Sequence, residues 1–220
     1  MGVAFDAQTD TLLLFVRPPT GDYCQLVSLR SNASEWLEVQ RFSTRIRCTS
    51  SSIVFSGEIL KYIVVCDSRV LLVERGGNTM YVFDVSAEHT LRDAGNVTLQ
   101  SGAYGVACTC SDGVTLVAYT DYYTSVSLLR LSLLPLRLVP LASISLPYSR
   151  RLLFREDLLL VTGDWEGAIV AFRTSDNLLT ERRVLLDAQA GVRVFAWALT
   201  GDRLVLFNWN SGDLLVYDFT

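Results

Sequence analysis

The chain has 220 residues, of which half are hydrophobic and 19 % are charged, with a formal net charge of −4 and a mean hydropathy of +0.31. A chain of this length can bury a substantial core without metal or disulfide staples. The composition argues against intrinsic disorder and coiled coil. The acidic balance argues against a general nucleic-acid or anionic-membrane binder, because neither polyanion would attract the chain at long range.

The same succession of short β-rich runs and turns recurs five times along the chain, and helix-period runs with caps are missing. The copies cover residues 3–29, 62–85, 105–131, 150–173 and 192–219. The last run of each copy starts near Gln25, Met80, Ser125, Ala168 and Asp213. The intervals are 55, 45, 43 and 45 residues, so three of the four are nearly equal.

An all-β repeat of about 40–45 residues is typical of a propeller blade. We therefore expect an all-β fold, a β-propeller or partial propeller of about five four-stranded blades. The expected single domain covers residues 1–220, with approximate units 1–30, 35–86, 97–132, 136–174 and 178–220. In this scheme the segments 35–42, 97–100, 136–145 and 178–186 supply the innermost strands of the blades.

Two copies end in an aromatic–Asp pair, Phe83-Asp84 and Tyr217-Asp218, and the small turn Ser111-Asp112-Gly113 precedes another run. On these residues the chain resembles the WD-repeat type of β-propeller, over nearly its whole length. The sequence departs from that pattern in two ways: no Gly-His pair precedes a repeat, and three copies lack the aromatic–Asp pair.

WD-type rings usually contain six to eight blades, so five units leave three alternatives. The ring closes with five blades, a partner protein supplies the missing blades, or the chain is one portion of a longer parent. We favour the second and third together, because an open ring would leave unpaired backbone and apolar blade faces in water.

Residues suited to catalysis are scarce. His89 is the only histidine and is expected in an exposed loop. Cys108 and Cys110 share one face of a strand and are expected to pack in the core. The odd number of cysteines, five in all, favours buried reduced thiols in an intracellular compartment. Phosphate-binding loops of the usual spacing are missing. We therefore expect no catalytic residue, no metal and no cofactor.

The most informative feature is the set of turns before the last run of each copy, which should emerge on one face of a propeller. Three of these five turns carry large aromatic residues, and a fourth carries an arginine. Aromatic and arginine side chains are typical interface anchors. The predicted partner-binding residues are Trp165, Trp209, Tyr122, Tyr123 and Arg75. The alternative is that Trp165 and Trp209 fold back onto their own blades.

These features predict a non-catalytic protein–protein interaction scaffold, a propeller subunit of a larger complex, rather than an enzyme. Its expected partners are other proteins, one of which completes the ring. Nucleic acid and membrane insertion are not expected, and the expected location is the cytoplasm or nucleus. Two other functions stay open. One is a propeller-type enzyme or small-ligand binder with its site at the central channel, and the other is an RNA-associated propeller in a ribonucleoprotein.

Overall fold

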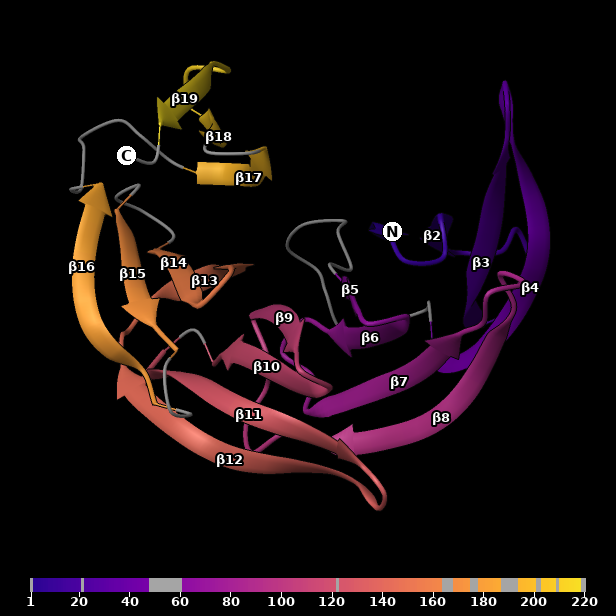
Figure 1. The fold of residues 1–220 in the computed structure, drawn as a ribbon, viewed down its shortest axis with the longest axis horizontal. Coiled ribbons are helices and arrows are strands. Elements are labelled where there is room, and N and C mark those ends of the chain that lie inside the picture. The colour runs from indigo at the N-terminus through magenta and orange to yellow at the C-terminus, as the bar shows by residue number, and fades with distance from the viewer. Residues whose placement is uncertain are drawn as a thin grey trace. The chain divides into compact units, whose positions relative to one another are not determined.

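The computed structural model describes residues 2–20, 22–47, 61–121, 123–163, 168–174, 178–186, 194–200, 203–208 and 210–218. Within these residues the chain is all-β, with nineteen strands in five antiparallel sheets that follow one another along the chain (Figure 1). The described residues include no helix that could cross a membrane.

Each sheet is built from consecutive strands. The first sheet contains β1 (Gly2–Asp6), β2 (Thr11–Val16), β3 (Tyr23–Asn32) and β4 (Glu35–Arg47). The second contains β5 (Lys61–Cys66), β6 (Arg69–Glu74), β7 (Thr79–Val85) and β8 (Leu91–Thr98). The third contains β9 (Gly105–Ser111), β10 (Val114–Thr120), β11 (Ser125–Leu133) and β12 (Leu136–Ser145). The fourth contains β13 (Ser149–Arg155), β14 (Leu158–Gly163), β15 (Ile169–Arg173) and β16 (Thr180–Leu186). The fifth contains β17 (Val194–Thr200), β18 (Arg203–Asn208) and β19 (Leu214–Asp218).

Strands that are adjacent in the chain are hydrogen-bonded neighbours in every sheet. Five such meander sheets are the blades of a β-propeller fold, and the predicted fold class is confirmed. One detail differs, because the fifth sheet has three strands within the described residues, not four.

The expected role of the segments between copies is wrong. Residues 35–42 do not open the second blade but belong to β4, which pairs with β3 from Asn32↔Glu35 to Tyr23↔Arg47. In the same way β8, β12 and β16 are the fourth strands of the second, third and fourth sheets. A tight hairpin to the preceding strand is the shortest way to pair such a segment, but the spacing of the repeats does not reveal which neighbour it joins.

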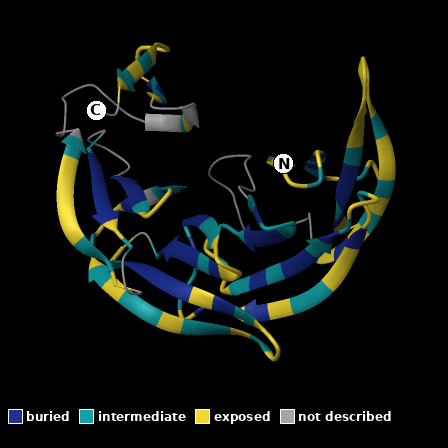
Figure 2. Ribbon diagram, viewed as in Figure 1, coloured by how far each residue is buried: buried dark blue, intermediate teal, exposed yellow. Residues whose placement is uncertain are grey.

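The core lies on both faces of the middle strands. In β6, Val70 and Leu72 point to one side and Leu71 and Val73 to the other, and all four are buried. Val70, Leu72 and Phe83 pack against residues of the first sheet, including Leu13 and Phe15. Figure 2 shows the contrast between the buried middle strands and the partly exposed fourth strands β4, β8, β12 and β16.

The chain divides into two compact units. The first comprises Met1–Ala103, Cys108–Leu116 and Arg130–Val139, and the second comprises Tyr104–Ala107, Val117–Leu129 and Pro140–Thr220. Each site described below lies within one of these units.

A close backbone contact fixes the turn between β6 and β7. The Gly76 amide donates to the Ala103 carbonyl at 2.6 Å, and the Ala103 amide donates to the Gly77 carbonyl at 2.9 Å. Between them, a Cβ added to Gly102 would lie 2.2 Å from the Gly76 carbonyl oxygen. The sequence therefore needs glycine at position 102 because backbone occupies the space of a side chain.

Gly102→Ala is expected to lower the free energy of unfolding by about 3 kcal/mol, because the added methyl group meets backbone that cannot rotate away. Gly113→Ala is the control, since a Cβ there meets nothing within 4 Å although φ is +74°. It should cost about 1–2 kcal/mol from the left-handed backbone alone. Urea denaturation measures both, and equal losses would show that the 99–103 loop can move away from the turn.

Candidate functional site

The predicted partner-binding residues are only partly within the described chain. Trp165, Trp209 and Tyr122 lie outside it. Tyr123 is exposed in the turn between β10 and β11, and its ring contacts Tyr104 edge-to-face with centroids 6.0 Å apart. Arg75 is half-buried in the turn between β6 and β7 and belongs to the other compact unit. The partner-binding role of these five residues stays a prediction.

His89 does not lie free in a loop as expected. Its Nδ1 atom is 2.7 Å from Oγ1 of the buried Thr11, which is 2.8 Å from Oγ1 of Thr9. Thr9 in turn donates to the buried Asp6 carboxylate at 2.6 Å. This chain of groups joins the β7–β8 turn to the first sheet. Sequence reasoning could not find it, because Thr11 and His89 are 78 residues apart.

The cysteines also differ from expectation. Cys24 is disulfide-bonded, so the expectation that all five thiols are reduced is wrong. Cys66, Cys108 and Cys110 are free. The argument from cysteine usage for an intracellular compartment therefore no longer holds.

Cys66 of β5 lies beside the thiols of β9, and the pKa values of the two β9 thiols, Cys108 and Cys110, are raised. A hydrogen bond with Cys66, together with burial, raises the pKa of Cys108 well above its ordinary value. Burial raises the pKa of Cys110 to about 11, against the opposing effect of the Thr115 hydroxyl 3.0 Å away. Such neutral thiols are poor nucleophiles. Among the described residues, no group of three histidine, cysteine or acidic side chains could hold a metal ion.

Alkylation of Cys110 by iodoacetamide should therefore climb about tenfold per pH unit from pH 8 to 10 and level off only near 11, because only the thiolate reacts. In protein unfolded by urea the same cysteine should level off near the ordinary value of about 8.5. Mass spectrometry of the modified peptide gives both curves. Identical curves would show that Cys110 is solvated in the folded protein.

Two cavities of similar size lie between consecutive sheets. The first, of about 620 Å³, lies between the fourth and fifth sheets. The second, of about 640 Å³, lies between the second sheet and the β11–β12 hairpin. Both volumes are typical of small-molecule sites, so the chemistry of their walls must distinguish them.

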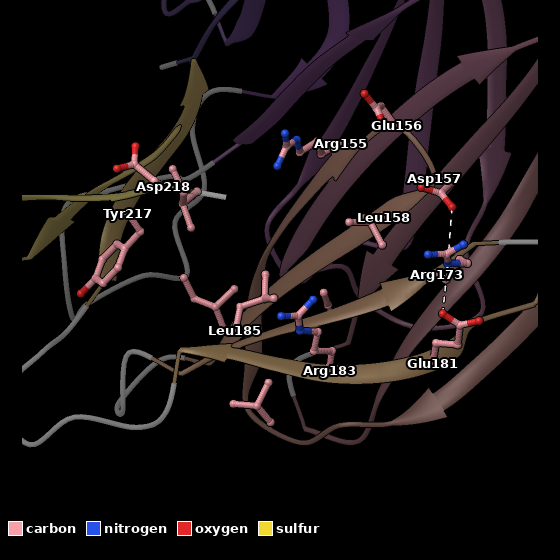
Figure 3. A pocket seen from close by; sticks show the side chains of 14 residues that line it. Arg155, Glu156, Asp157, Leu158, Arg173, Glu181, Arg183, Leu185, Tyr217 and Asp218 are labelled. Atoms are coloured by element: carbon pink, nitrogen blue, oxygen red, sulfur yellow. Dashed lines mark ion pairs between the residues drawn. The ribbon is translucent and has the colours of Figure 1, made fainter. Parts of the chain in front are cut away.

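The first cavity combines an apolar floor with polar walls. Ile169, Ala171 and Leu204 form the floor and belong to the core between the two sheets. Tyr217 of β19 packs against that core from one side. Figure 3 shows charged side chains around this floor, contributed by strands β13, β15, β16 and β19 and by the β13–β14 turn. The charged lining residues are Arg155, Glu156, Asp157, Arg173, Glu181, Arg183 and Asp218.

Most of these charges are paired. The Arg173 Nε lies 3.1 Å from Glu181 and 3.6 Å from Asp157, and Asp218 binds Arg203 at 3.0 Å. Arg183 and Glu156 form no ion pair with any residue in the described part of the chain. Within the described part of the chain, the cavity therefore presents a guanidinium and a carboxylate that have no ionic partner.

The arginines in the walls of the second cavity are both paired with carboxylates, and the further carboxylate, Asp93, accepts a hydrogen bond from the Gly95 amide. Asp84 binds Arg92 at 2.6 Å and Arg69 at 3.8 Å. Asp67 binds Arg69 at 2.7 Å, and this hydrogen bond lowers the pKa of Asp67. The remaining lining includes three leucines of the β11–β12 hairpin. The first cavity is therefore the candidate site.

Comparison with known proteins shows the fold. No protein-family model and no curated protein matches the sequence. Solved structures match over nearly the whole chain. A protein from Bacteroides uniformis described as a "putative 6-phosphogluconolactonase" is 13 % identical with a TM-score of 0.70, and one from Bacteroides fragilis with the same description is 11 % identical with a TM-score of 0.65. Each of these two matches covers 98 % of this chain and 66 % of the Bacteroides protein. A chain of a nidogen/laminin complex matches at 14 % identity, with a TM-score of 0.60, over 99 % of this chain and 74 % of that one.

These matches contradict the prediction of a non-catalytic scaffold, and with it the prediction that the chain is not an enzyme. Two of the matched propellers are described as enzymes, which favours the alternative of an enzyme or small-ligand binder. The prediction took the single histidine and the missing motifs as evidence against chemistry. The polar cavity is lined by arginines and carboxylates from several strands. Because these residues are far apart in the sequence, no local motif predicts the cavity.

Proposed function

We propose that this chain is an enzyme-like propeller that binds a small anionic molecule between its fourth and fifth sheets. One observation carries the proposal. Arg183, which has no ion pair among the described residues, lines a cavity of about 620 Å³ with an apolar floor and the ring of Tyr217. A cation at such a site favours an anion.

The lining indicates the kind of ligand. A guanidinium matches a carboxylate or phosphate with two parallel hydrogen bonds. Ile169, Ala171 and Leu204 can cover the carbon skeleton, and the polar walls suit hydroxyl groups. We infer a phosphorylated or carboxylated sugar-like molecule, a class that includes the lactone in the descriptions of the two Bacteroides proteins.

The same groups fit the hydrolysis of such a lactone. Water adds to the carbonyl carbon, the ring C–O bond breaks, and the product is a hydroxy acid that releases a proton. Glu156 is the lining carboxylate that has no ion pair among the described residues, so it can take the proton from water. Arg183 can stabilise the negative charge on the carbonyl oxygen or hold the phosphate.

Membership of the WD-repeat type is also a proposal. It is supported by the two aromatic–Asp pairs, in which Asp84 binds Arg69 and Asp218 binds Arg203 across the neighbouring strand.

Arg183→Ala should weaken binding of 6-phosphogluconate, a stable hydrolysis product, by about 10- to 100-fold, because a charge-assisted hydrogen bond is lost. Arg182→Ala is the matched control, because Arg182 is the adjacent residue of β16 and does not line the cavity. Isothermal titration calorimetry measures both variants, with gluconate as the ligand without phosphate. Equal affinities for the two variants would place the ligand elsewhere.

Glu156→Gln should slow hydrolysis of 6-phosphogluconolactone about 100-fold, as expected for loss of a general base. Its affinity for 6-phosphogluconate should stay the same, because Arg183 is unchanged. Proton release followed with a pH indicator gives the rate. A wild-type chain that binds 6-phosphogluconate without accelerating hydrolysis would be a binding protein and not this enzyme.

A further inference from the structure

The second cavity, of about 640 Å³, lies within the first compact unit. One of its walls is formed by the β5–β6 turn and by residues of β6, β7 and β8, and the other by the β11–β12 hairpin. None of its lining residues belongs to the first cavity. A ligand bound here is therefore separate from the anion proposed above.

A β-bulge in β8 brings three consecutive residues to the cavity. The register of β7 with β8 shifts between Val82 and Phe83, and Ala94 is the residue without a counterpart. Side chains of a regular strand alternate between the two faces of the sheet, whereas a bulge re-aims the side chains beside it. Arg92, Asp93 and Ala94 accordingly all line the cavity.

The contact between the bulge and the hairpin requires glycine at position 95. Gly95 has a φ of +119°, a backbone conformation that glycine adopts readily. A Cβ at this position would lie 2.9 Å from Cδ2 of Leu136 in the hairpin. The Gly95 amide also donates to the Asp93 carboxylate at 2.8 Å, which orients that side chain. Backbone, hairpin and carboxylate are therefore fixed relative to one another at this wall.

Arg92 and Asp93 present opposite charges side by side. The other charged lining residues, Asp67, Arg69 and Asp84, are paired with one another. Arg92 binds Asp84 at 2.6 Å through one nitrogen, but its side chain is 81 % exposed and a guanidinium has five N–H donors. Asp93 is exposed and forms no ion pair with any residue in the described part of the chain. These two side chains can therefore bind a carboxylate and an ammonium group.

The opposite wall is apolar. Leu133, Leu134 and Leu136 of the hairpin line it, and Leu134 is 95 % exposed. Covering such a leucine with an apolar group is favourable by about 25 cal/mol for each Å² removed from water. The volume of the cavity suits an organic molecule with an apolar body rather than a single ion.

We propose that the second cavity binds a zwitterionic molecule with an apolar body, of the class of dipeptides with apolar side chains. Arg92 binds the carboxylate of the ligand, Asp93 binds its ammonium group, and the hairpin leucines cover its side chains. A ligand with charges of one sign only would meet a like charge at one of the two residues. Arg183→Ala, which tests the first cavity, should leave dipeptide binding unchanged, so the two proposals can fail separately.

Isothermal titration calorimetry of the full chain with the dipeptide Leu-Leu should show saturable binding. Asp93→Asn and Arg92→Gln should each weaken it about two- to five-fold, the effect of an exposed ion pair. Asp112→Asn is the matched control, because Asp112 is an exposed aspartate of the same compact unit that does not line the cavity. It should leave the affinity unchanged.

Two modified dipeptides assign the charges. N-acetyl-Leu-Leu lacks the ammonium group and should bind the wild-type chain and Asp93→Asn equally, in both cases more weakly than Leu-Leu binds the wild type. Leu-Leu amide lacks the carboxylate and should behave in the same way with Arg92→Gln. Leu134→Ser should weaken all three peptides by the same factor. An absence of binding, equal affinity of the wild type for Leu-Leu and its N-acetyl form, or an unchanged affinity in Asp93→Asn would each overturn the proposal.

Discussion

The structure depends on burying both faces of the middle strands. Val70 to Val73 of β6 are apolar at every position, and all four side chains are buried. A sheet with two apolar faces needs a neighbour on each side. The second sheet meets the first through Leu13, Phe15, Leu72 and Phe83, and the fifth meets the fourth through Leu160, Ala171, Leu204 and Leu206.

Because the sheet interiors are apolar, charged groups collect at the ends and outer strands of the sheets. There they pair across neighbouring strands, as Arg69, Asp84 and Arg92 do in the second sheet. Where the fourth and fifth sheets meet, fewer of the charged side chains form ion pairs within the described residues. Arg183 and Glu156 have no ion pair among the described residues, and Asp218 has one arginine where Asp84 has two. The proposed binding of a small anion arises from these incomplete pairings.

The functional prediction was wrong because it looked for chemistry in local motifs. The single histidine and the absence of glycine-rich phosphate loops favour a non-catalytic scaffold over the enzyme alternative only when chemistry is sought in local motifs. The candidate site instead draws Arg155, Arg183 and Tyr217 from three strands of two sheets. Proteins described as putative 6-phosphogluconolactonases share the fold at 11–13 % identity, although no family model matches the sequence of this chain.

The sequence by itself determined the all-β class and the number of blades, because alternating apolar runs and turn residues are local signals that repeat along the chain. Only the tertiary structure decided which strand each segment joins, as for β4, which the spacing of the repeats assigns to the next blade and which pairs with β3. It also decided the contact of His89 with Thr11 and the grouping of Arg183 with Tyr217. Such contacts join residues far apart in the chain, and their energies depend on packing between sheets that no local pattern encodes.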